Sequence, residues 1–266
     1  MTRSTGLARV GGQSGARARP GGSPTSCHPA LARQPVSVRG FSLIELMVAL
    51  AITMALSAGM LSMLANTRVT SAAQSQMEQF QEDERLLLTR LTDTIQNAGY
   101  FPNPQGTTQA NVLGVVNGQF ATAGQSLSGT TGGAAPGDTL VVRYQASTTD
   151  GVMDCSGKTN TTGSALVMVN SFSVDANGVL NCSVNGGASQ PLATGVNNFK
   201  VQYGIDSTGS GWMDSYRSAS AMTASNWTNV YSVRLSITLQ NPLAGQPGQP
   251  ATLPAITQVI PVLNQL

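Results

Sequence analysis

The stretch "RGFSLIELMVALAIT", Arg39 to Thr53, opens a long apolar segment. From residue 46 to residue 64 the chain has no charged residue and no proline, and this length is about what one helix needs to cross a bilayer. The main alternative is a secretory signal, whose apolar core is normally about 7 to 15 residues long and ends at a small-residue cleavage site. The longer run favours a membrane-spanning helix.

Helix-forming sequence continues beyond this run through "TRVTSAAQSQMEQFQEDERLLLTRLTDTIQNAGY", residues 67–100. Apolar residues recur there every three, four or seven positions, which places them on one stripe of a helix: Ala73, Met77, Phe80, Leu87, Leu91, Ile95 and Ala98. Gly99 and then Pro102 are stop signals. The pattern predicts one continuous helix over residues 41–98, roughly 85 to 90 Å long at about 1.5 Å per residue.

The charged residues are distributed unevenly about Phe41. Six of the fourteen basic residues precede it and no acidic residue does, so the chain from Phe41 onward holds eight basic and twelve acidic residues. Arg33 and Arg39 lie just before the apolar run and the acidic cluster "EDE" (82–84) follows it, so the positive-inside rule predicts a cytoplasmic N-terminus and an exported C-terminal part. The acidic balance after Phe41 gives little support to nucleic-acid binding.

The composition excludes several kinds of catalytic site. Only 10% of the residues are charged, and 29 glycines accompany many Ser, Thr, Asn and Gln, which is typical of an exported surface of strands and loops. The sole histidine, His28, precedes Phe41. The rest of the chain therefore has no Ser-His or Cys-His nucleophile pair and no histidine for zinc. We expect no enzymatic activity and no cofactor.

The cysteines suggest one structural bridge. Cys27 lies before Phe41, which leaves Cys155 and Cys182 as an even pair in the part expected to be exported. A disulfide formed in an oxidising compartment is the simplest interpretation, and two buried free thiols are the alternative. A loop of this length closed by a disulfide contributes roughly 3 to 4 kcal/mol to stability.

Glu45 is the one charged residue inside the opening of the apolar run. A carboxylate costs about 2.5 to 3.5 kcal/mol at the centre of a bilayer on insertion scales, and less near an interface. It either lies at the interface, favoured by the positive end of the helix, or meets a cation. A chain cut after Gly40 would supply that cation as the α-amine of Phe41, on the same subunit or on a neighbour.

The residues "G/FSLIE" resemble the N-terminal signature of type IV prepilins. The resemblance implies that a membrane peptidase cleaves after Gly40 and methylates the new amine of Phe41. It also implies that Glu45 pairs with the N-terminal amine of a neighbouring subunit during assembly. Prepilin leaders are usually short, whereas residues 1–40 form a long basic leader here; we therefore expect translation to begin nearer the cut, for instance at Val36 or Val38.

The C-terminal part reads as strands and loops. Residues 103–137 lack periodicity and read as a loop with a short strand at "NVLGVV" (111–116), and clearer strands are predicted at 139–145, 165–174, 179–184, 198–205 and 230–240. Asn177-Gly178 favours a hairpin that places Cys182 on its second strand.

The order of these segments resembles the PilW family of type IV pilus minor pilins. The resemblance rests on "LTRLTDTIQNAGYF", "DTLVVRYQ", "DCSG", "GVLNCSV", "PLATGVNNFKVQYGIDSTGSG" and "VYSVRLSITL". It implies an α+β, pilin-like fold in which a long N-terminal helix packs on an antiparallel β-sheet. The expected parts are the leader at 1–40, a transmembrane and assembly helix at 41–65, its amphipathic continuation at 66–100 and an exported β-rich domain at 101–266.

The loop "DSTGSGWMD" has some features of a calcium loop. Asp206, Thr208, Ser210, Gly211 and Asp214 fall at positions 1, 3, 5, 6 and 9 of such a loop. Position 12 is Arg217 in place of glutamate, and two ligand positions hold hydroxyls. A polar turn without metal is the favoured interpretation.

Four aromatic residues near this loop have two possible roles. Trp212 and Trp227, with Tyr216 and Tyr231, fit either an exposed contact surface or the core.

On the resemblance, the chain is expected to be a structural minor pilin that acts in the assembly or initiation of a type IV pilus or in its tip complex. The alternatives are a pseudopilin of a type II secretion system and a pilus-tip adhesin. The expected partners are major and minor pilins, the prepilin peptidase, the inner-membrane assembly machinery and a tip adhesin. The chain should cross the inner membrane once, with a periplasmic C-terminal domain, and then reach the pilus at the cell surface.

Overall fold

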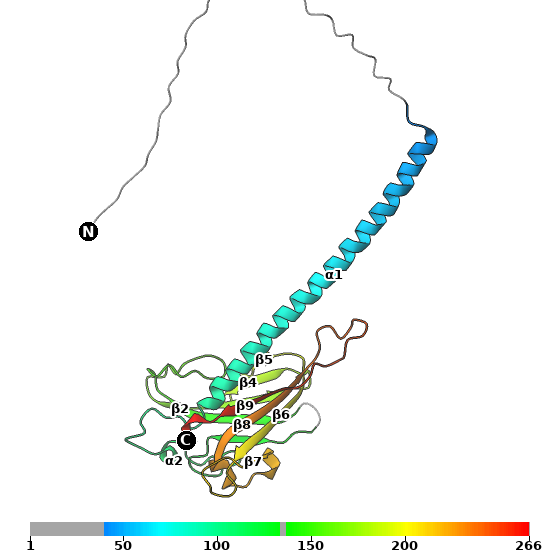
Figure 1. The fold of residues 1–266 in the computed structure, drawn as a ribbon. Helices are drawn as coiled ribbons and strands as arrows, with labels where there is room; N and C mark the ends of the chain where they lie inside the picture. The colour runs from blue at the N-terminus through cyan, green and yellow to red at the C-terminus, as the bar shows by residue number, and fades with distance from the viewer. Residues whose placement is uncertain (1–39, 134–136, 266) are drawn as a thin grey trace, which may run out of the picture. The chain divides into compact units, whose positions relative to one another are not determined.

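The computed structural model describes residues 40–133 and 137–265. The expected leader, with Cys27 and His28, therefore lies outside the described residues, except for Gly40. The described chain is α+β: one long helix precedes nine strands in two antiparallel sheets (Figure 1). The predicted fold class is confirmed.

Helix α1 runs without interruption over Leu43–Gln96. Its C-terminal half is amphipathic, as the spacing predicts. Leu87, Leu91, Ile95 and Ala98 are buried, and Ala73, Met77 and Phe80 are partly buried. Every apolar position of the predicted stripe is therefore covered to some degree, while the polar residues between them stay mostly exposed.

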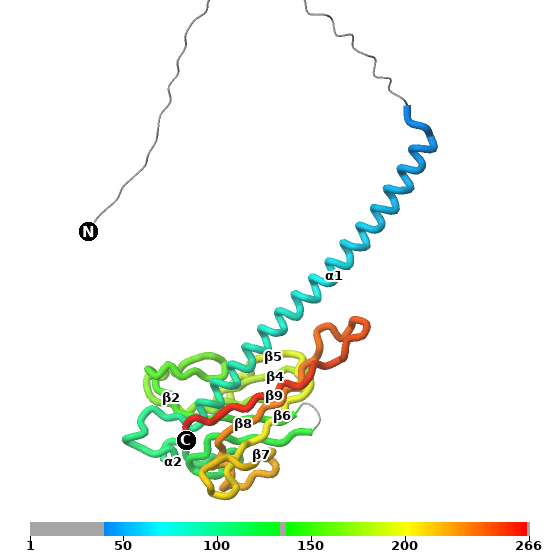
Figure 2. The backbone as a smooth tube through the Cα atoms, viewed as in Figure 1, coloured from blue at the N-terminus to red at the C-terminus, as the bar shows by residue number. Residues whose placement is uncertain are grey.

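The end of α1 is closed by a glycine and by residues far away in sequence. Gly99 adopts a φ of +78°, a left-handed conformation that glycine reaches at little cost and that ends many helices. The amide Nδ2 of Asn264 donates hydrogen bonds to the carbonyls of Gln96 (3.3 Å) and Ala98 (3.2 Å). Figure 2 shows the red C-terminal segment returning to this end of the helix. The last residues thus satisfy carbonyls that the helix itself leaves unpaired.

Two sheets make up the rest of the fold. The five-stranded sheet has the order β1 (Leu127–Thr130), β2 (Thr139–Ala146), β3 (Leu166–Val174), β4 (Leu180–Val184) and β5 (Gln190–Ala193). The four-stranded sheet has the order β7 (Ser215–Arg217), β6 (Val196–Ile205), β8 (Val230–Leu239) and β9 (Ile256–Pro261). All strand pairs are antiparallel.

The five strands predicted from the sequence are present as β2, β3, β4, β6 and β8, with ends that agree within two residues. The predicted strand at 111–116 is wrong. A short helix, α2 (Gln109–Val112), occupies the start of that segment, and the Thr108 hydroxyl accepts a hydrogen bond from the Asn111 amide at its first turn. The stabilisation that the capping threonine gives to the helical turn outweighs the preference of the following β-branched residues for a strand. Three short 3₁₀ turns, η1 (Ala219–Ala221), η2 (Asn226–Thr228) and η3 (Leu263–Gln265), complete the described chain.

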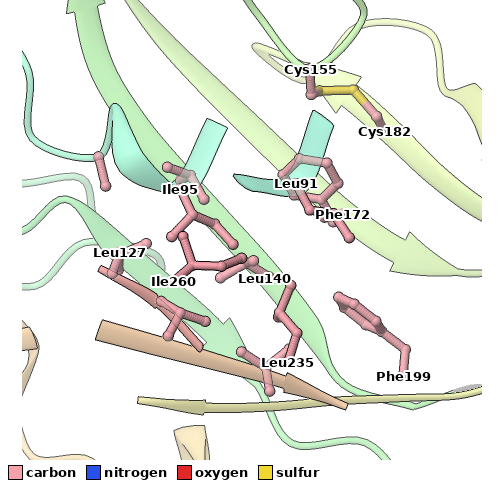
Figure 3. Packing of buried hydrophobic residues seen from close by; sticks show 14 of the residues in the cluster. Leu91, Ile95, Leu127, Leu140, Cys155, Phe172, Cys182, Phe199, Leu235 and Ile260 are labelled. Atoms are coloured by element: carbon pink, nitrogen blue, oxygen red, sulfur yellow. A yellow bond between two sulfur atoms is a disulfide. The ribbon is translucent and has the colours of Figure 1, made fainter. Parts of the chain in front are cut away.

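Residues from α1 and from both sheets form one hydrophobic core. Leu91 and Ile95 of α1 lie in the same cluster as Leu140 and Phe172 of the first sheet and Leu235 and Ile260 of the second (Figure 3). All six are buried. Because the apolar stripe of α1 supplies part of this core, the amphipathic half of the helix and the two sheets depend on one another.

Cys155 and Cys182 form a disulfide, with their Cα atoms 6.2 Å apart (Figure 3). Cys182 lies on β4, the second strand of the hairpin predicted at Asn177-Gly178. Gly178 alone of these two residues has a positive φ, +72°. The Cys155 amide donates to Oδ1 of the buried Asn170 on β3 (2.8 Å), so the loop that carries Cys155 is held to the sheet by two independent links.

Candidate functional site

The N-terminal end of the described chain holds the predicted cleavage site. Gly40 and Phe41 precede α1, and its first turn begins where the Leu46 amide donates to the carbonyl of Ser42 (3.1 Å). Phe41 is 83% exposed, and a Cβ built on Gly40 would meet no atom within 4 Å. The Gly40–Phe41 bond therefore lies in open, non-helical chain, which is the state a peptidase requires.

Glu45 lies in the first turn of α1 and is exposed. At this end of a helix the unpaired amides carry a partial positive charge, which favours a carboxylate by about 0.3 to 1 kcal/mol. No ion pair joins Glu45 to another residue of the described chain. It follows Phe41 by four residues, and Phe41 lies just before the first turn of α1.

The N-terminal half of α1 exposes an unbroken apolar surface. Its large apolar side chains from Phe41 to Val69 are between 49% and 83% exposed. An 18-residue window of α1 reaches a mean hydropathy of 2.0 with none of it buried, so this helix is long and apolar enough to cross a membrane. The hydroxyl of Thr53 is satisfied within the helix by the carbonyls of Ala49 (3.0 Å) and Leu50 (2.9 Å). Such a surface requires an apolar environment, either lipid or other helices.

The loop between β6 and β7 uses its two carboxylates to hold itself together. Asp206 accepts hydrogen bonds from the amides of Thr208 (3.1 Å), Gly209 (2.7 Å) and Ser210 (3.1 Å) through Oδ1, and from Gly211 (2.6 Å) through Oδ2. Asp214 accepts from the amide and hydroxyl of Ser207 and from the amide of Thr208.

These bonds leave the carboxylates strongly acidic. Desolvation acts to raise the pKa of Asp206, but the amide hydrogen bonds together outweigh it and lower that pKa. For Asp214 desolvation is again opposed, mainly by the hydroxyl and amide of Ser207, and the pKa falls to about 2. The hydroxyls of Thr208 and Ser210 approach Asp206 as well.

The described residues contain no group of three His, Cys, Asp or Glu side chains arranged to hold a metal ion. Arg217, in the position of the missing glutamate, lies on β7. The loop therefore brings Asp206, Thr208, Ser210 and Asp214 together as a self-bonded polar turn.

The structure shows which of the four aromatic residues are exposed and which are partly buried, a distinction that the sequence alone left open. Trp212 is 79% exposed at the tip of the loop. Trp227 is partly buried and packs edge-on against Tyr203, with ring centroids 4.6 Å apart. Tyr216 is partly buried beneath the guanidinium of Arg234, at 3.6 Å from the ring centroid. Tyr231, on β8, is also only partly buried, so Trp212 is the only one of the four that is mostly exposed.

Sequence analysis missed the role of Arg143 on β2. Its side chain is 2% exposed and donates to the carbonyls of Gln125 (2.6 Å), Gly114 (2.7 Å) and Leu113 (3.2 Å). Its guanidinium stacks 3.9 Å from the centroid of the Phe120 ring, and desolvation lowers its pKa to about 10. The signal was a lone arginine within the apolar run "TLVVRYQ", which marks a strand covered on both faces. Arg143 fixes the segment between α1 and β1 against the sheet.

Two protein-family models match the chain. The model of the prokaryotic N-terminal methylation motif matches residues 37–61, which include Gly40, Phe41 and Glu45. The model described as type IV pilus-assembly protein W, PilW, matches residues 158–255, which include β3 to β8. No curated protein matches the chain significantly.

Proposed function

The chain belongs to the PilW family of type IV pilus-associated pilins, and from this premise we propose that it is a minor pilin, a structural subunit that acts in pilus assembly or initiation or in the tip complex. The observation that carries the proposal is the start of α1. An exposed Gly40–Phe41 bond, a carboxylate one turn later and an uncovered apolar helix stand together inside the matched methylation motif.

In this proposal the chain is first a precursor that crosses the inner membrane once through the apolar half of α1. The basic residues before Phe41 hold the N-terminus in the cytoplasm, and the β-rich domain lies in the periplasm. The prepilin peptidase cuts after Gly40 and methylates the amine of Phe41. The cut leaves Phe41 as the first residue and a charged amine close to the membrane surface.

Assembly then moves the apolar half of α1 from lipid into a bundle of similar helices. This exchange of one apolar environment for another costs little, so the charge of Glu45 decides the register. Glu45 is compensated when the amine of Phe41 of a neighbouring subunit comes within hydrogen-bonding distance. The partners are therefore other major and minor pilins, the peptidase and the inner-membrane assembly machinery, and the assembled subunit reaches the cell surface.

The match to the PilW model supports a pilus in preference to a type II secretion pseudopilus. The exposed Trp212 leaves a tip adhesin as a second candidate, because an exposed indole on a self-bonded loop is suited to contact with another molecule.

The cut site is tested by Gly40→Leu, in which a bulky side chain should keep the peptidase from the backbone. We expect uncleaved, membrane-held precursor and no incorporation into sheared pili, as measured by the mass of the N-terminal peptide. Gly59→Leu is the matched control, because Gly59 also lies in open space on α1 and the cut should proceed normally. Mature protein beginning with methylated Phe41 in the Gly40→Leu strain would refute the assignment.

A further inference from the structure

Four strands form the edges of the two sheets, and three of them are protected. β1 is covered by η1 and η2, and the Ser128 carbonyl accepts a hydrogen bond from the Tyr203 hydroxyl (3.3 Å). β5 contains Pro191, which has no amide hydrogen, beside an irregular register at Leu180/Asn181. β7 has only three residues. Short length, proline and coverage are the usual ways in which proteins prevent unwanted strand pairing.

The fourth edge, β9, has none of these protections along Ile256–Ile260. It is a six-residue strand at the end of the four-stranded sheet, and its one proline, Pro261, is the last residue (Figure 1). No charged residue occurs in it. β9 therefore presents an open edge.

The register of β9 identifies which of its backbone groups are unpaired. The Val262 amide donates to the Tyr231 carbonyl (2.9 Å), which makes this a hydrogen-bonded pair of the antiparallel ladder. Alternate pairs along the ladder share that pattern, so Ile260, Gln258 and Ile256 also bond to β8. The amides and carbonyls of Thr257 and Val259 then point away from β8, and no partner for them occurs in the described parts of the chain.

A groove runs along this edge. It has a volume of about 580 Å³ and lies between Ile256–Gln258 of β9 and the outer face of α1, where the wall includes Gln81, Arg85, Thr89 and Thr92. The side-chain amide of Gln258 donates to Thr92 Oγ1 (3.2 Å), while its carbonyl oxygen is buried and has no partner among the described residues. The walls are mixed, because Leu88 and Ile256 add apolar surface to the polar side chains, and such a lining accepts both the backbone and the apolar side chains of a peptide.

From these observations we propose that β9 accepts an additional strand, an extended segment of another pilus protein that pairs with the outward groups of Thr257 and Val259 along the α1 groove. The segment is expected to carry no acidic side chain on the side facing α1, because the two carboxylates Glu84 and Asp93 outnumber the one guanidinium, Arg85, on that wall. Main-chain hydrogen bonds supply affinity, and the groove selects the side chains.

A second copy of this chain does not fit the same edge within a pilus. Pairing of β9 with β9 in the antiparallel sense relates the two copies by a two-fold axis, and such a contact closes on itself as a dimer. The proposed function requires contacts that repeat along a filament. The exclusion of a second copy rests on the proposed function. A different protein is therefore the source of the added strand.

The test compares amide hydrogen exchange of the full mature chain in detergent with that of the same chain in sheared pili. We expect Thr257 and Val259 to exchange rapidly in detergent and to slow by at least about tenfold in pili. Gln258 and Ile260 are internal controls, because their amides already bond to β8 and should be protected in both states.

A pair of variants tests the same edge in cells. Val259→Pro removes an outward amide and fixes the local φ, whereas Val259→Thr keeps that amide and changes the side chain to a similar size. Incorporation into pili should fall at least about fivefold for proline and stay unchanged for threonine, with the disulfide formed in both.

The outcomes are distinguishable. Rapid exchange of Thr257 and Val259 in pili that contain the chain would overturn the added strand but leave the proposed function intact. Protection of both amides in detergent, together with a dimer, would assign the edge to a second copy and overturn the proposed source. Absence of the chain from sheared pili would contradict the proposed function itself.

Discussion

At the scale of single residues, charge placement carries most of the proposed function. Glu45 stands in an exposed apolar helix without an ion pair among the described residues, and Arg143 is buried without a carboxylate. The two charged side chains differ in whether the described chain provides partners for them. Arg143 is satisfied within its own chain by three carbonyls and an aromatic ring, whereas Glu45 has no ion pair among the described residues, as its proposed pairing with a neighbouring subunit requires.

Replacing Glu45 should affect assembly more than insertion or folding. Glu45→Val removes a charge that is costly in lipid, so the precursor should insert, be cut after Gly40 and form its disulfide, while incorporation into pili falls strongly. Glu45→Asp keeps the charge with a shorter reach and should give an intermediate level, measured by quantitative blotting of sheared pili. Glu78→Val, at an exposed carboxylate of α1 beyond the apolar run, is the control. Incorporation of Glu45→Val at the wild-type level would exclude charge pairing for this subunit.

The loop of Trp212 should lose its order in acid. The pKa of Asp214 is depressed to about 2, against about 3.9 for an unperturbed aspartate, so its stabilising bonds are fully present above pH 4. They are lost as the pH falls from about 4 through about 2. Fluorescence of Trp212 in a Trp227→Phe background should report this transition, and Asp214→Asn should weaken it and leave the part that belongs to Asp206, whose pKa is also lowered. A transition unchanged by Asp214→Asn would assign it to another group.

At the scale of elements, the two halves of helix α1 differ in their surroundings. Its N-terminal half exposes apolar side chains, and its C-terminal half buries them in the core of both sheets. Since Leu91 is fully buried in that core, the second half depends on close packing rather than on helix propensity.

Leu91→Ala should therefore destabilise the β-rich domain by about 2 to 5 kcal/mol, the usual range for a buried leucine. Urea unfolding of the mature protein in detergent, followed by tryptophan fluorescence, measures the change. Leu86→Ala is a matched control, because Leu86 lies on the same helix but is 54% exposed. Equal losses for the two variants would show that the burial of Leu91 is not what stabilises the domain.

The elements that could be predicted from the sequence are those whose own residue pattern determines which face is buried. The stripe from Ala73 to Ala98 specifies its own buried face and is confirmed, and β8 is present within one residue of its predicted range, 230–240. β1, β5, β7 and β9 were missed because edge strands of three to six residues, two of them containing proline, are defined by pairing with a neighbour and not by periodicity. The residues at the start of α1 were identified by their motif, whereas the groove beside β9 depends on residues more than 160 positions apart in sequence, such as Thr92 and Gln258.

At the scale of the whole molecule, the chain combines a hydrophobic anchor with a domain that has one buried disulfide. Cys155 is 1% exposed and Cys182 is 0% exposed, so the bridge is enclosed by the core cluster. It joins the loop after β2 to β4 across 27 residues of sequence. The disulfide stabilises the whole domain because it restricts the conformations of the unfolded chain.

Replacing both cysteines by serine should lower the free energy of unfolding by about 3 to 4 kcal/mol and reduce the amount of chain in the periplasm. Mass mapping of the wild type without reductant should find a single linked pair of peptides. Periplasmic protein with two thiols open to alkylation would contradict the bridge. The Cys27→Ser variant is the control, because Cys27 precedes the expected cut and should not affect the mature domain.

The cap that Asn264 places on α1 has a consequence for the order of events during biosynthesis. The helix emerges from the ribosome well before the side chain that closes its end, because Asn264 follows Gln96 by 168 residues. The carbonyls at the end of α1 therefore stay without this cap until β9 and Asn264 have been made. A chain interrupted before Asn264 would keep the apolar half of α1 and the motif at its start yet lack the closing contact.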